Sequence, residues 1–432
     1  MKNVQFDWPQ AKKAAEKAVQ SHFAENLKDV EILVLQGAWE GLTYEDMAEK
    51  YHLSLNYLRS DVGSKLWKKL SEAFGETVTK TNFKEALQRI SSANTEIIFP
   101  SGSLPANSPF YIERGGLESQ CYTTLDKPGS LIRIKAPRLM GKTSLVNRIL
   151  DYGQTLGYRT VYLDLACVEG NILKDVDKLL RWLCFQVTRG LTLENKLKIY
   201  WDTEILGSND NCTGYFEDYI LPSVDGTLVL ALDTIDRIFY HPAIIGDFFG
   251  MLRSWHEKGK TSASWQNLRL VLAHSTEAYI PLNINRSPFN AGFPVELTEF
   301  TPAQSKGLAR LYKLGYTGED LERIRSIIGG HPYLMQLTFY HLSTGQVTLN
   351  ELLNNYAGET GIYRDHLREY LDILSDRAAE REALKQIVTA DKALELDSML
   401  MYKLHSLGLI EYEKDLVVPR SQLYRAYFNR VL

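Results

Sequence analysis

A glycine, a lysine and a threonine follow one another at 141–143, separated by four residues from the preceding apolar stretch 130–136 and directly before a helical pattern. Backbone N–H groups at a helix start and a lysine ammonium group can hold a phosphate chain, while the next hydroxyl can ligate Mg²⁺. Ala136 replaces the usual opening glycine, but it is small and lets the chain leave a strand. The sequence therefore predicts a site for ATP or ADP with Mg²⁺. Its expected contacts here are Ala136, Pro137, Arg138, Met140, Gly141, Lys142, Thr143 and Ser144.

A second apolar strand, 227–233, ends in Asp233, which is expected to share the Mg²⁺ with Thr143. The next residue is Thr234, where many ATPases of this kind carry a glutamate as general base. A threonine hydroxyl does not accept a proton at neutral pH, so we hypothesise slow hydrolysis or none, a weak ATPase at most. Asp236 and Glu277 are candidate replacement bases, in which case turnover would be normal.

Two later motifs are candidates for the same site. The strand 267–275 ends in His274 and Ser275, and a hydroxyl there would either sense the γ-phosphate or simply cap the strand. The motif GGHPYL at 329–334 begins a helix with Pro332 in its first turn, which could press a helical domain against the nucleotide.

The flanking patterns predict an α/β fold with a parallel sheet covered on both faces. Near-continuous apolar strands are expected at 130–136, 158–166, 227–233 and 267–275, and helical stretches lie between them. Beyond residue 301 the pattern is helical, and LGLIEYEKDLVVP predicts the hairpin of a winged helix. The expected domains are an N-terminal helix or extension (1–24), a helix-turn-helix (25–90), a linker (91–108), a nucleotide-binding domain (109–300), a helical lid (301–364) and a winged helix (365–432).

Residues 25–90 show three short helical blocks, the second with Thr43 as N-cap, while 11–24 are expected to form a short exposed helix. The third block carries the side chains that could contact DNA or a protein partner: Asn56, Arg59, Lys65, Lys68 and Lys69. The segment has nine Lys/Arg against eleven Asp/Glu, so no basic footprint favours DNA. Specific DNA binding and protein docking both remain open.

Composition narrows the class of protein. The chain has 432 residues and a net charge of −4, which gives no general attraction to nucleic acid or anionic membranes. No stretch is apolar enough for a membrane span, and the four cysteines show no metal spacing. We expect a cytoplasmic protein without a membrane partner and without a metal site beyond Mg²⁺. Arg420 and Arg425 are interpreted as a small, solvated basic spot.

With these motifs in order, the sequence resembles the AAA-like ATPases of bacterial signalling proteins, which are related to the STAND class. The resemblance rests on SPFYIERGGLESQCY, IRIKAPRLMGKTSL, LVLALD, LRLVLAHSTEAYIPLNINRSPFNAG, GGHPYL and LYRAYF. The N-terminal part is similar to the helix-turn-helix domain of proteins associated with von Willebrand A and MoxR partners. The resemblance implies a P-loop NTPase sheet with a helical lid, Arg114 on the adenine side and Pro332 near the nucleotide.

Three functions follow from this sequence. The first is an ATP-binding switch that relays its nucleotide state to a protein partner or an assembly, including a homo-oligomer. The second is a DNA-binding transcriptional regulator whose nucleotide site is mainly structural. The third is an active, motor-like ATPase.

Overall fold

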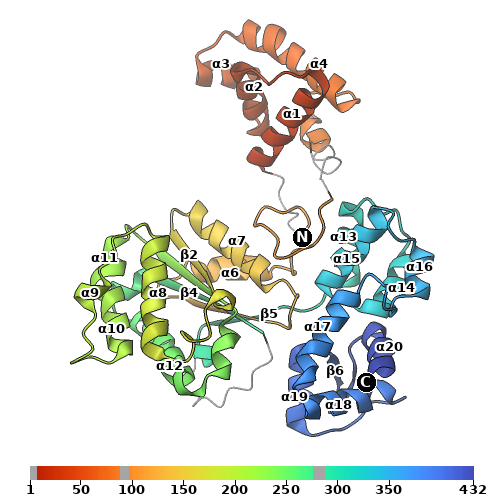
Figure 1. Cartoon of the computed structure of the whole chain (residues 1–432). Coiled ribbons are helices and arrows are strands. Elements are labelled where there is room, and N and C mark those ends of the chain that lie inside the picture. The colour runs from red at the N-terminus through yellow and green to blue at the C-terminus, as the bar shows by residue number, and fades with distance from the viewer. Residues whose placement is uncertain (1–6, 88–96, 276–287) are drawn as a thin grey trace. The chain divides into compact units, whose positions relative to one another are not determined.

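The computed structural model describes residues 7–87, 97–275 and 288–432, apart from the side chains of Ser21 and Pro288. These residues belong to two compact units, Met1–Ile97 (the N-terminal unit) and Ile98–Leu432 (the C-terminal unit) (Figure 1). Among the described residues, no helix is both long and apolar enough to cross a membrane.

The N-terminal unit is helical, with α1 (Trp8–Phe23), α2 (Asp29–Trp39), α3 (Tyr44–Tyr51), the π-helical segment η1 (Tyr57–Gly63) and α4 (Ser64–Phe74). Thr43 caps α3 as expected, because its hydroxyl oxygen accepts a hydrogen bond from the Asp46 N–H at 3.1 Å. The expected exposed helix is wrong in one respect. Ala11, Ala15 and Val19 of α1 are fully buried in the core of this unit, because small apolar side chains recur along one face.

The C-terminal unit contains a five-stranded parallel sheet in the order β2-β3-β4-β1-β5. Its strands are β1 (Leu131–Lys135), β2 (Arg159–Asp164), β3 (Leu228–Asp233), β4 (Leu268–His274) and β5 (Phe293–Glu296). The four expected strands are confirmed within a residue or two at each end. The short β5 at the edge was not predicted, because only its Val295 is buried and the apolar signal is weak.

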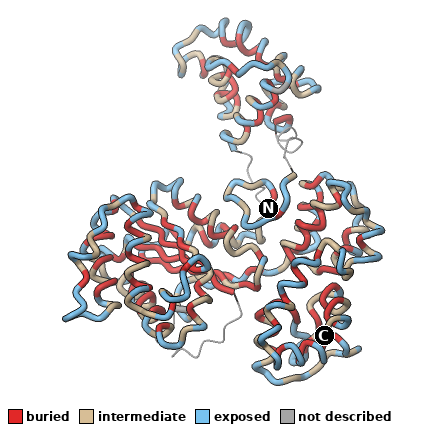
Figure 2. Tube along the Cα trace, in the orientation of Figure 1, coloured by how far each residue is buried: buried red, intermediate tan, exposed pale blue. Residues whose placement is uncertain are grey.

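Side chains that alternate along the strands belong to two core clusters, one on each face of the sheet. Figure 2 shows the strands of the sheet as largely buried. Leu228, Leu230 and Leu232 pack in a cluster with residues of α8 (Val176–Gly190), α10 (Ser208–Tyr215) and α12 (Pro242–Lys258). The intervening Val229 and Ala231 pack in a second cluster with residues of α6 (Leu117–Leu125) and α7 (Lys142–Thr155). Because both faces are covered, the central strands β3 and β4 are buried at every residue, whereas β2 at the edge of the sheet is only partly buried.

The remaining connections of the sheet are short. They are η2 (Leu165–Cys167), α9 (Leu197–Tyr200), η3 (Phe216–Ile220), α11 (Leu221–Ser223), η4 (Ile235–Tyr240), η5 (Trp265–Asn267) and η6 (Pro288–Asn290).

Helices follow the sheet to the end of the chain. They are α13 (Pro302–Leu311), α14 (Gly318–Ile328), α15 (Pro332–Ser343), α16 (Leu349–Asn354), α17 (Arg364–Ser375), α18 (Ala378–Thr389), α19 (Ser398–Leu407) and α20 (Gln422–Val431). The antiparallel pair β6 (Ile410–Glu413) and β7 (Leu416–Pro419) lies between α19 and α20. A hairpin is therefore present where the sequence predicts one, while the assignment of 365–432 as a winged helix stays a prediction.

Candidate nucleotide-binding site

The predicted phosphate loop connects the end of β1 to the start of α7. Gly141 is the N-cap of α7 and has a φ of 97°, and Leu139 also lies in the left-handed region at 59°. Left-handed residues turn successive N–H groups toward the inside of a loop. Ala136, at the position of the missing glycine, is fully buried and packs in the α6–α7 core cluster. This position therefore requires a small side chain, but it does not require the conformational freedom of glycine.

The ammonium group of Lys142 lies over this loop. Its Nζ donates hydrogen bonds to the carbonyl oxygens of Ala136 at 3.0 Å and Pro137 at 2.9 Å. The loop's own backbone thus positions the charge at the helix N-terminus, where the helix dipole also favours an anion. Phosphate oxygens are the ligand that this combination of amides and ammonium fits.

Thr143 and Asp233 meet although ninety positions separate them in the sequence. The Thr143 Oγ1 donates to the Asp233 Oδ2 at 2.5 Å, and the other carboxylate oxygen accepts from the Thr234 N–H at 2.7 Å. Burial raises the pKa of Asp233, and the neighbouring charge of Asp164 adds to this effect. A hydroxyl and a carboxylate side by side suit Mg²⁺, which prefers one or two protein oxygens together with nucleotide phosphates.

The described residues provide no larger cluster of metal ligands than this pair. Within the described residues, no group of three or more His, Cys, Asp or Glu side chains is placed to hold a metal ion. A magnesium ion bound here would therefore be shared between the protein and the nucleotide, with Thr143 and Asp233 as the protein's contribution.

Tyr162 is a neighbour of Asp233 that the sequence did not suggest. Its hydroxyl donates to the Asp233 Oδ2 at 3.2 Å from the adjacent strand β2. Burial and the Asp233 carboxylate together raise the pKa of Tyr162, so this side chain stays a neutral donor. Only the pairing of β2 with β3 brings the two residues together.

The two candidate bases have different outcomes. The Oδ1 of Asp236 accepts a hydrogen bond from the backbone N–H of Ser275 at 2.9 Å, which ties η4 to the end of β4. Glu277 lies outside the described residues. Thr234 has a φ of 55°, an uncommon conformation for a β-branched residue, directly after the predicted metal ligand. None of these observations tests catalysis, and both bases remain predictions.

The end of β4 is buried beside η4. His274 is only 8% exposed, and burial lowers the pKa of its imidazole to about 4. The hydroxyl of Ser275 is buried and has no hydrogen-bond partner among the described residues. An unpaired buried hydroxyl is costly in a folded protein, and it is compatible with the expected role of Ser275 as a phosphate sensor.

Arg114 connects the loop to the segment after β5. One terminal nitrogen donates to the Met140 carbonyl at 3.1 Å and the other to the Thr298 carbonyl at 2.6 Å, while the guanidinium lies 4.5 Å from the ring centre of Phe300. The structure thus places Arg114 against the phosphate loop itself. Its expected contact with the adenine side stays a prediction.

The start of α15 lies next to the loop. His331 caps the helix that begins with Pro332, and its imidazole has a backbone hydrogen bond to Arg138. Burial lowers the pKa of His331 to about 3, and the charges of Arg420 and Arg114 contribute in the same direction. The motif GGHPYL and the loop are therefore neighbours, while the contact of Pro332 with the nucleotide stays a prediction.

The loop also contacts elements near the C-terminus. Arg138 forms an ion pair with Glu369 of α17. A Cβ added to Gly408, directly after α19, would lie 2.9 Å from the Pro137 side chain, so only glycine allows this approach. The first half of the phosphate loop is thus held between the sheet and the helices α17 and α19.

The basic spot predicted from Arg420 and Arg425 is not solvated. The Nε of Arg420 donates to the Glu299 Oε1 at 2.8 Å, and the other oxygen of Glu299 accepts from the Gly330 N–H at 2.7 Å. Arg425 donates to the Ala390 carbonyl at 2.5 Å. The interpretation as a solvated face was wrong because sequence spacing could not reveal these distant partners.

Part of the expected linker 91–108 packs on the helix behind the loop. The Leu104 N–H donates to the Ser144 Oγ at 2.9 Å, and the Leu104 carbonyl accepts from Asn147 at 3.0 Å. Arg148 donates to the Ala106 carbonyl at 2.8 Å, one turn further along α7. The side chain of Ser144 is thereby engaged with this segment, and its contact with nucleotide stays a prediction.

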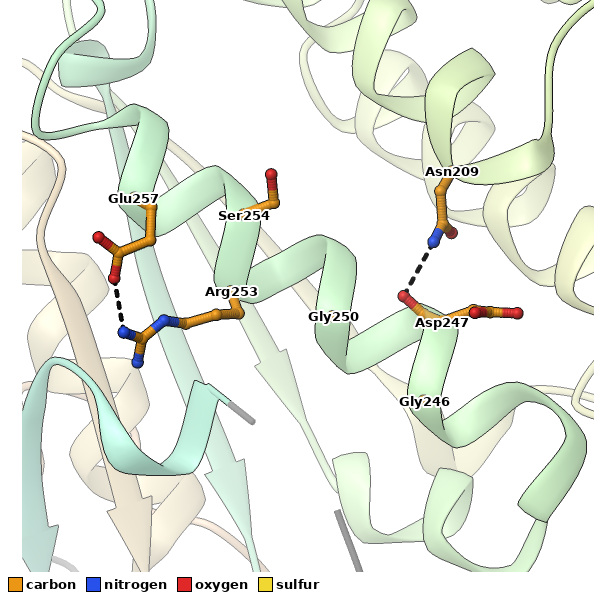
Figure 3. A pocket seen from close by; sticks show the side chains of 7 residues that line it. All are labelled: Asn209, Gly246, Asp247, Gly250, Arg253, Ser254 and Glu257. Atoms are coloured by element: carbon orange, nitrogen blue, oxygen red, sulfur yellow. Dashed lines mark hydrogen bonds and ion pairs between the residues drawn. The ribbon is translucent and has the colours of Figure 1, made fainter. Parts of the chain in front are cut away.

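A separate hollow lies between α10 and α12, away from the phosphate loop in sequence. Its volume is about 490 Å³. The lining residues are Asn209, Gly246, Asp247, Gly250, Arg253, Ser254 and Glu257 (Figure 3). Arg253 pairs with Glu257 one turn later at 2.7 Å, and Asn209 donates to the Asp247 carbonyl at 3.1 Å. These polar side chains are paired only in part, because the Asn209 Oδ1 is buried without a hydrogen-bond partner among the described residues. The hollow contains none of the predicted site residues.

The candidate contacts of the N-terminal unit do not form one cluster. Asn56, Arg59 and Lys65 are exposed. Lys69 instead forms an ion pair at 3.1 Å with the buried Glu31 of α2, and exposed Lys68 lies 4.0 Å from Glu72. Lys69 thus joins α4 to α2 through this ion pair, and the other four side chains lie on the surface.

Sequence comparisons match the two units to two families. The family described as "AAA-like domain" matches residues 99–430, and the family described as "vWA-MoxR associated protein N-terminal HTH" matches residues 6–90. An uncharacterized WD repeat-containing protein of Synechocystis sp. is 26% identical over 360 residues, which cover 76% of this chain. The chain spans only 30% of the length of that relative.

Comparison with solved structures identifies the fold. The Walker-type ATPase of Pyrococcus abyssi superposes with a TM-score of 0.53 at 12% identity, covering 74% of this chain and 96% of that one. The ORC2 protein of Aeropyrum pernix, in ADPNP and ADP complexes, has a TM-score of 0.44 at 14% identity, covering 76% and 96%. The first of these similarities, together with the parallel sheet, shows a P-loop ATPase fold.

Proposed function

The chain belongs to the family of AAA-like domains, and from this premise we propose that it is a switch that binds Mg–ATP, hydrolyses it slowly or not at all, and relays the nucleotide state to a protein partner or an assembly. One observation carries the proposal. Directly after Gly141, the N-cap of α7, and Lys142, its first residue, the Thr143 hydroxyl and the Asp233 carboxylate lie 2.5 Å apart. Amides, a cation and two oxygen ligands for Mg²⁺ thus converge at one helix start.

The contacts of the loop support a switch rather than a passive binding site. Arg138 and Pro137 of the loop contact α17 and the residue after α19, and His331 connects the loop to α15. A nucleotide that binds one arrangement of these contacts better than another would shift the population of the helical elements. A change at the nucleotide site would then be transmitted through α15, α17 and α19, which lie far from the loop in the sequence.

The binding test uses the full chain and fluorescently labelled ATP with Mg²⁺. Lys142→Ala is expected to weaken the affinity about 100-fold, since it removes charge-assisted contacts of about 1.5–3 kcal/mol each. Lys178→Ala, an exposed lysine of α8, is the matched control and should bind as the unsubstituted chain does. Equal affinities for both variants would refute the proposed site.

The switch and an active ATPase differ in turnover. A steady-state rate well below about 1 per second is expected with saturating Mg–ATP, because Thr234 replaces the usual base. Turnover at or above that rate would favour the motor-like ATPase.

A DNA-binding regulator is the second candidate function. The N-terminal match to a helix-turn-helix family and the exposed Asn56, Arg59 and Lys65 favour it. Phosphate contacts make affinity fall steeply with salt, so a gel shift of the full chain over a salt series distinguishes DNA binding from protein docking. If DNA binding were the function, Lys142→Ala would leave it intact.

A further inference from the structure

Two neighbouring strands of the sheet end in an aspartate at the same level. The register of the parallel pair β2–β3 places Asp164 beside Asp233, and adjacent strands lie about 4.8 Å apart. Val161 and Leu163 pack in the core cluster of α8, α10 and α12, so the alternate residues Tyr162 and Asp164 are on the opposite face. That is the face of α7, on which Tyr162 reaches Asp233.

The carboxylate of Asp164 has a fixed position and an open oxygen. Its Oδ1 accepts a hydrogen bond from the Ala166 N–H at 2.9 Å, and its Oδ2 accepts none from any described residue. The turn that supplies Ala166 is itself held by Arg237 of η4, which donates to the carbonyls of Ala166 at 2.6 Å and Val168 at 2.8 Å. A preorganised carboxylate is therefore presented at the end of β2.

The other carboxylates of this edge are already engaged. Asp233 accepts hydrogen bonds on both oxygens, including the one from Thr143, and the expected metal would bind there. Asp236 accepts from the Ser275 N–H and holds two elements together. Among the described acids that this site brings together, Asp164 is thus the one that combines closeness to Asp233 with an oxygen free to accept a proton.

We propose that Asp164 is the general base for ATP hydrolysis in this chain and takes the role that Thr234 cannot perform. This inference rests on the proposed function, namely binding of Mg–ATP with slow turnover. In the step, the oxygen of a water molecule forms a bond to the γ-phosphorus, and the bond from that phosphorus to the β–γ bridging oxygen breaks. The bridging oxygen leaves with the electron pair as part of ADP. The water proton passes to the Asp164 Oδ2 and then to the released phosphate or to solvent.

The test compares single-turnover hydrolysis with ATP affinity in the same preparations of the full chain. Asp164→Asn is expected to slow hydrolysis at least about 100-fold, the usual contribution of a general base, while the Kd for Mg–ATP changes less than about threefold. Asp164→Glu keeps a carboxylate and should retain the rate within about tenfold. Asp151→Asn, an exposed acid on α7, is the matched control and should hydrolyse at the unsubstituted rate.

A second pair of variants tests the same role by rescue. Thr234→Glu combined with Asp164→Asn places a carboxylate at the usual position, and it should restore at least about tenfold of the lost rate. Thermal melting of each variant shows that the fold is retained.

The outcomes separate two kinds of failure. If the unsubstituted chain does not bind Mg–ATP, the proposed function fails. If it binds but does not hydrolyse, if Asp164→Asn hydrolyses normally, or if Asp236→Asn alone removes the activity, only the assignment of Asp164 is overturned. Loss of ATP affinity in Asp164→Asn would also overturn it, because a base acts in the chemical step and not in binding.

Discussion

The N-terminal and C-terminal units of this chain use their charged residues in different ways. In the N-terminal unit, the candidate contacts Arg59 and Lys65 are exposed, while Lys69 supports the packing of two helices. In the C-terminal unit, Lys142 and Asp233 come from distant parts of the sequence and converge at one helix start. Convergence of buried, oriented groups indicates chemistry, whereas a dispersed set of surface charges is equally compatible with solvation, DNA or a protein.

The largest expected effect concerns the convergent site. Asp233→Asn should abolish most of the Mg²⁺-dependent part of ATP affinity, about 100-fold, because it removes the charged metal ligand. The same variant should melt at a higher temperature without nucleotide, since burial raises the pKa of Asp233 and its charged form is therefore disfavoured near neutral pH. Titration of ATP with and without Mg²⁺, and thermal melting, check the two effects. An unchanged Mg²⁺ dependence of the ATP affinity would contradict the assignment of Asp233 as a metal ligand, and with it the contrast between the two units.

The second prediction concerns the stability of the two units at acidic pH. Burial lowers the pKa of His274 to about 4, of His331 to about 3 and of His366 well below the ordinary value, whereas His22 and His52 in the N-terminal unit are exposed. As the pH falls, these histidines therefore bind protons in the unfolded chain at a higher pH than in the folded chain. Stability of the C-terminal unit is present above about pH 6.5 and falls with decreasing pH, by up to about 1.4 kcal/mol per pH unit for each histidine.

Chemical denaturation between pH 7 and 5, monitored separately in the two units by hydrogen exchange, measures this difference. The C-terminal unit should lose more stability than the N-terminal one. Equal losses would mean that buried histidines do not distinguish the units.

The third prediction sharpens the comparison within the N-terminal unit. Lys69→Ala should lower the free energy of unfolding by about 1–3 kcal/mol, because it leaves the buried Glu31 without its cation. Lys68→Ala is the matched control, since the exposed Lys68–Glu72 pair contributes at most about 0.5 kcal/mol. Urea unfolding measures the free energy of unfolding of both variants. Equal decreases in the two variants would contradict a structural role of Lys69.

The smallest expected effect concerns the surface of the same unit. Replacing Arg59 and Lys65 together by alanine should leave ATP affinity and stability nearly unchanged, since both side chains are exposed. If this surface binds DNA, the double variant should reduce the slope of log affinity against log salt by about 2, one for each phosphate contact. A slope that stays the same, or the absence of any DNA complex, would favour protein docking.

Sequence patterns predicted the local features of the fold but not the contacts between distant residues. The capping of α3 by Thr43 and the turn at Gly141 that begins α7 were predicted and are present, because each depends on residues within a few positions of one another. The neighbours of Asp233 on β2 were not predicted. Tyr162 and Asp164 become its neighbours only because β2 pairs with β3, and nothing within a short window encodes that pairing.

Local periodicity and capping were enough to place the four longer strands within a residue or two, the starts of α3 and α7, and the residues that could face a phosphate, since these signals depend on neighbouring residues alone. The tertiary structure decided that Arg420 is bound to Glu299, that the segment around Leu104 lies on α7, and that two aspartates end adjacent strands. Those contacts join residues far apart in the chain. Strand order and register bring them together, and these depend on how the whole sheet buries its two apolar faces.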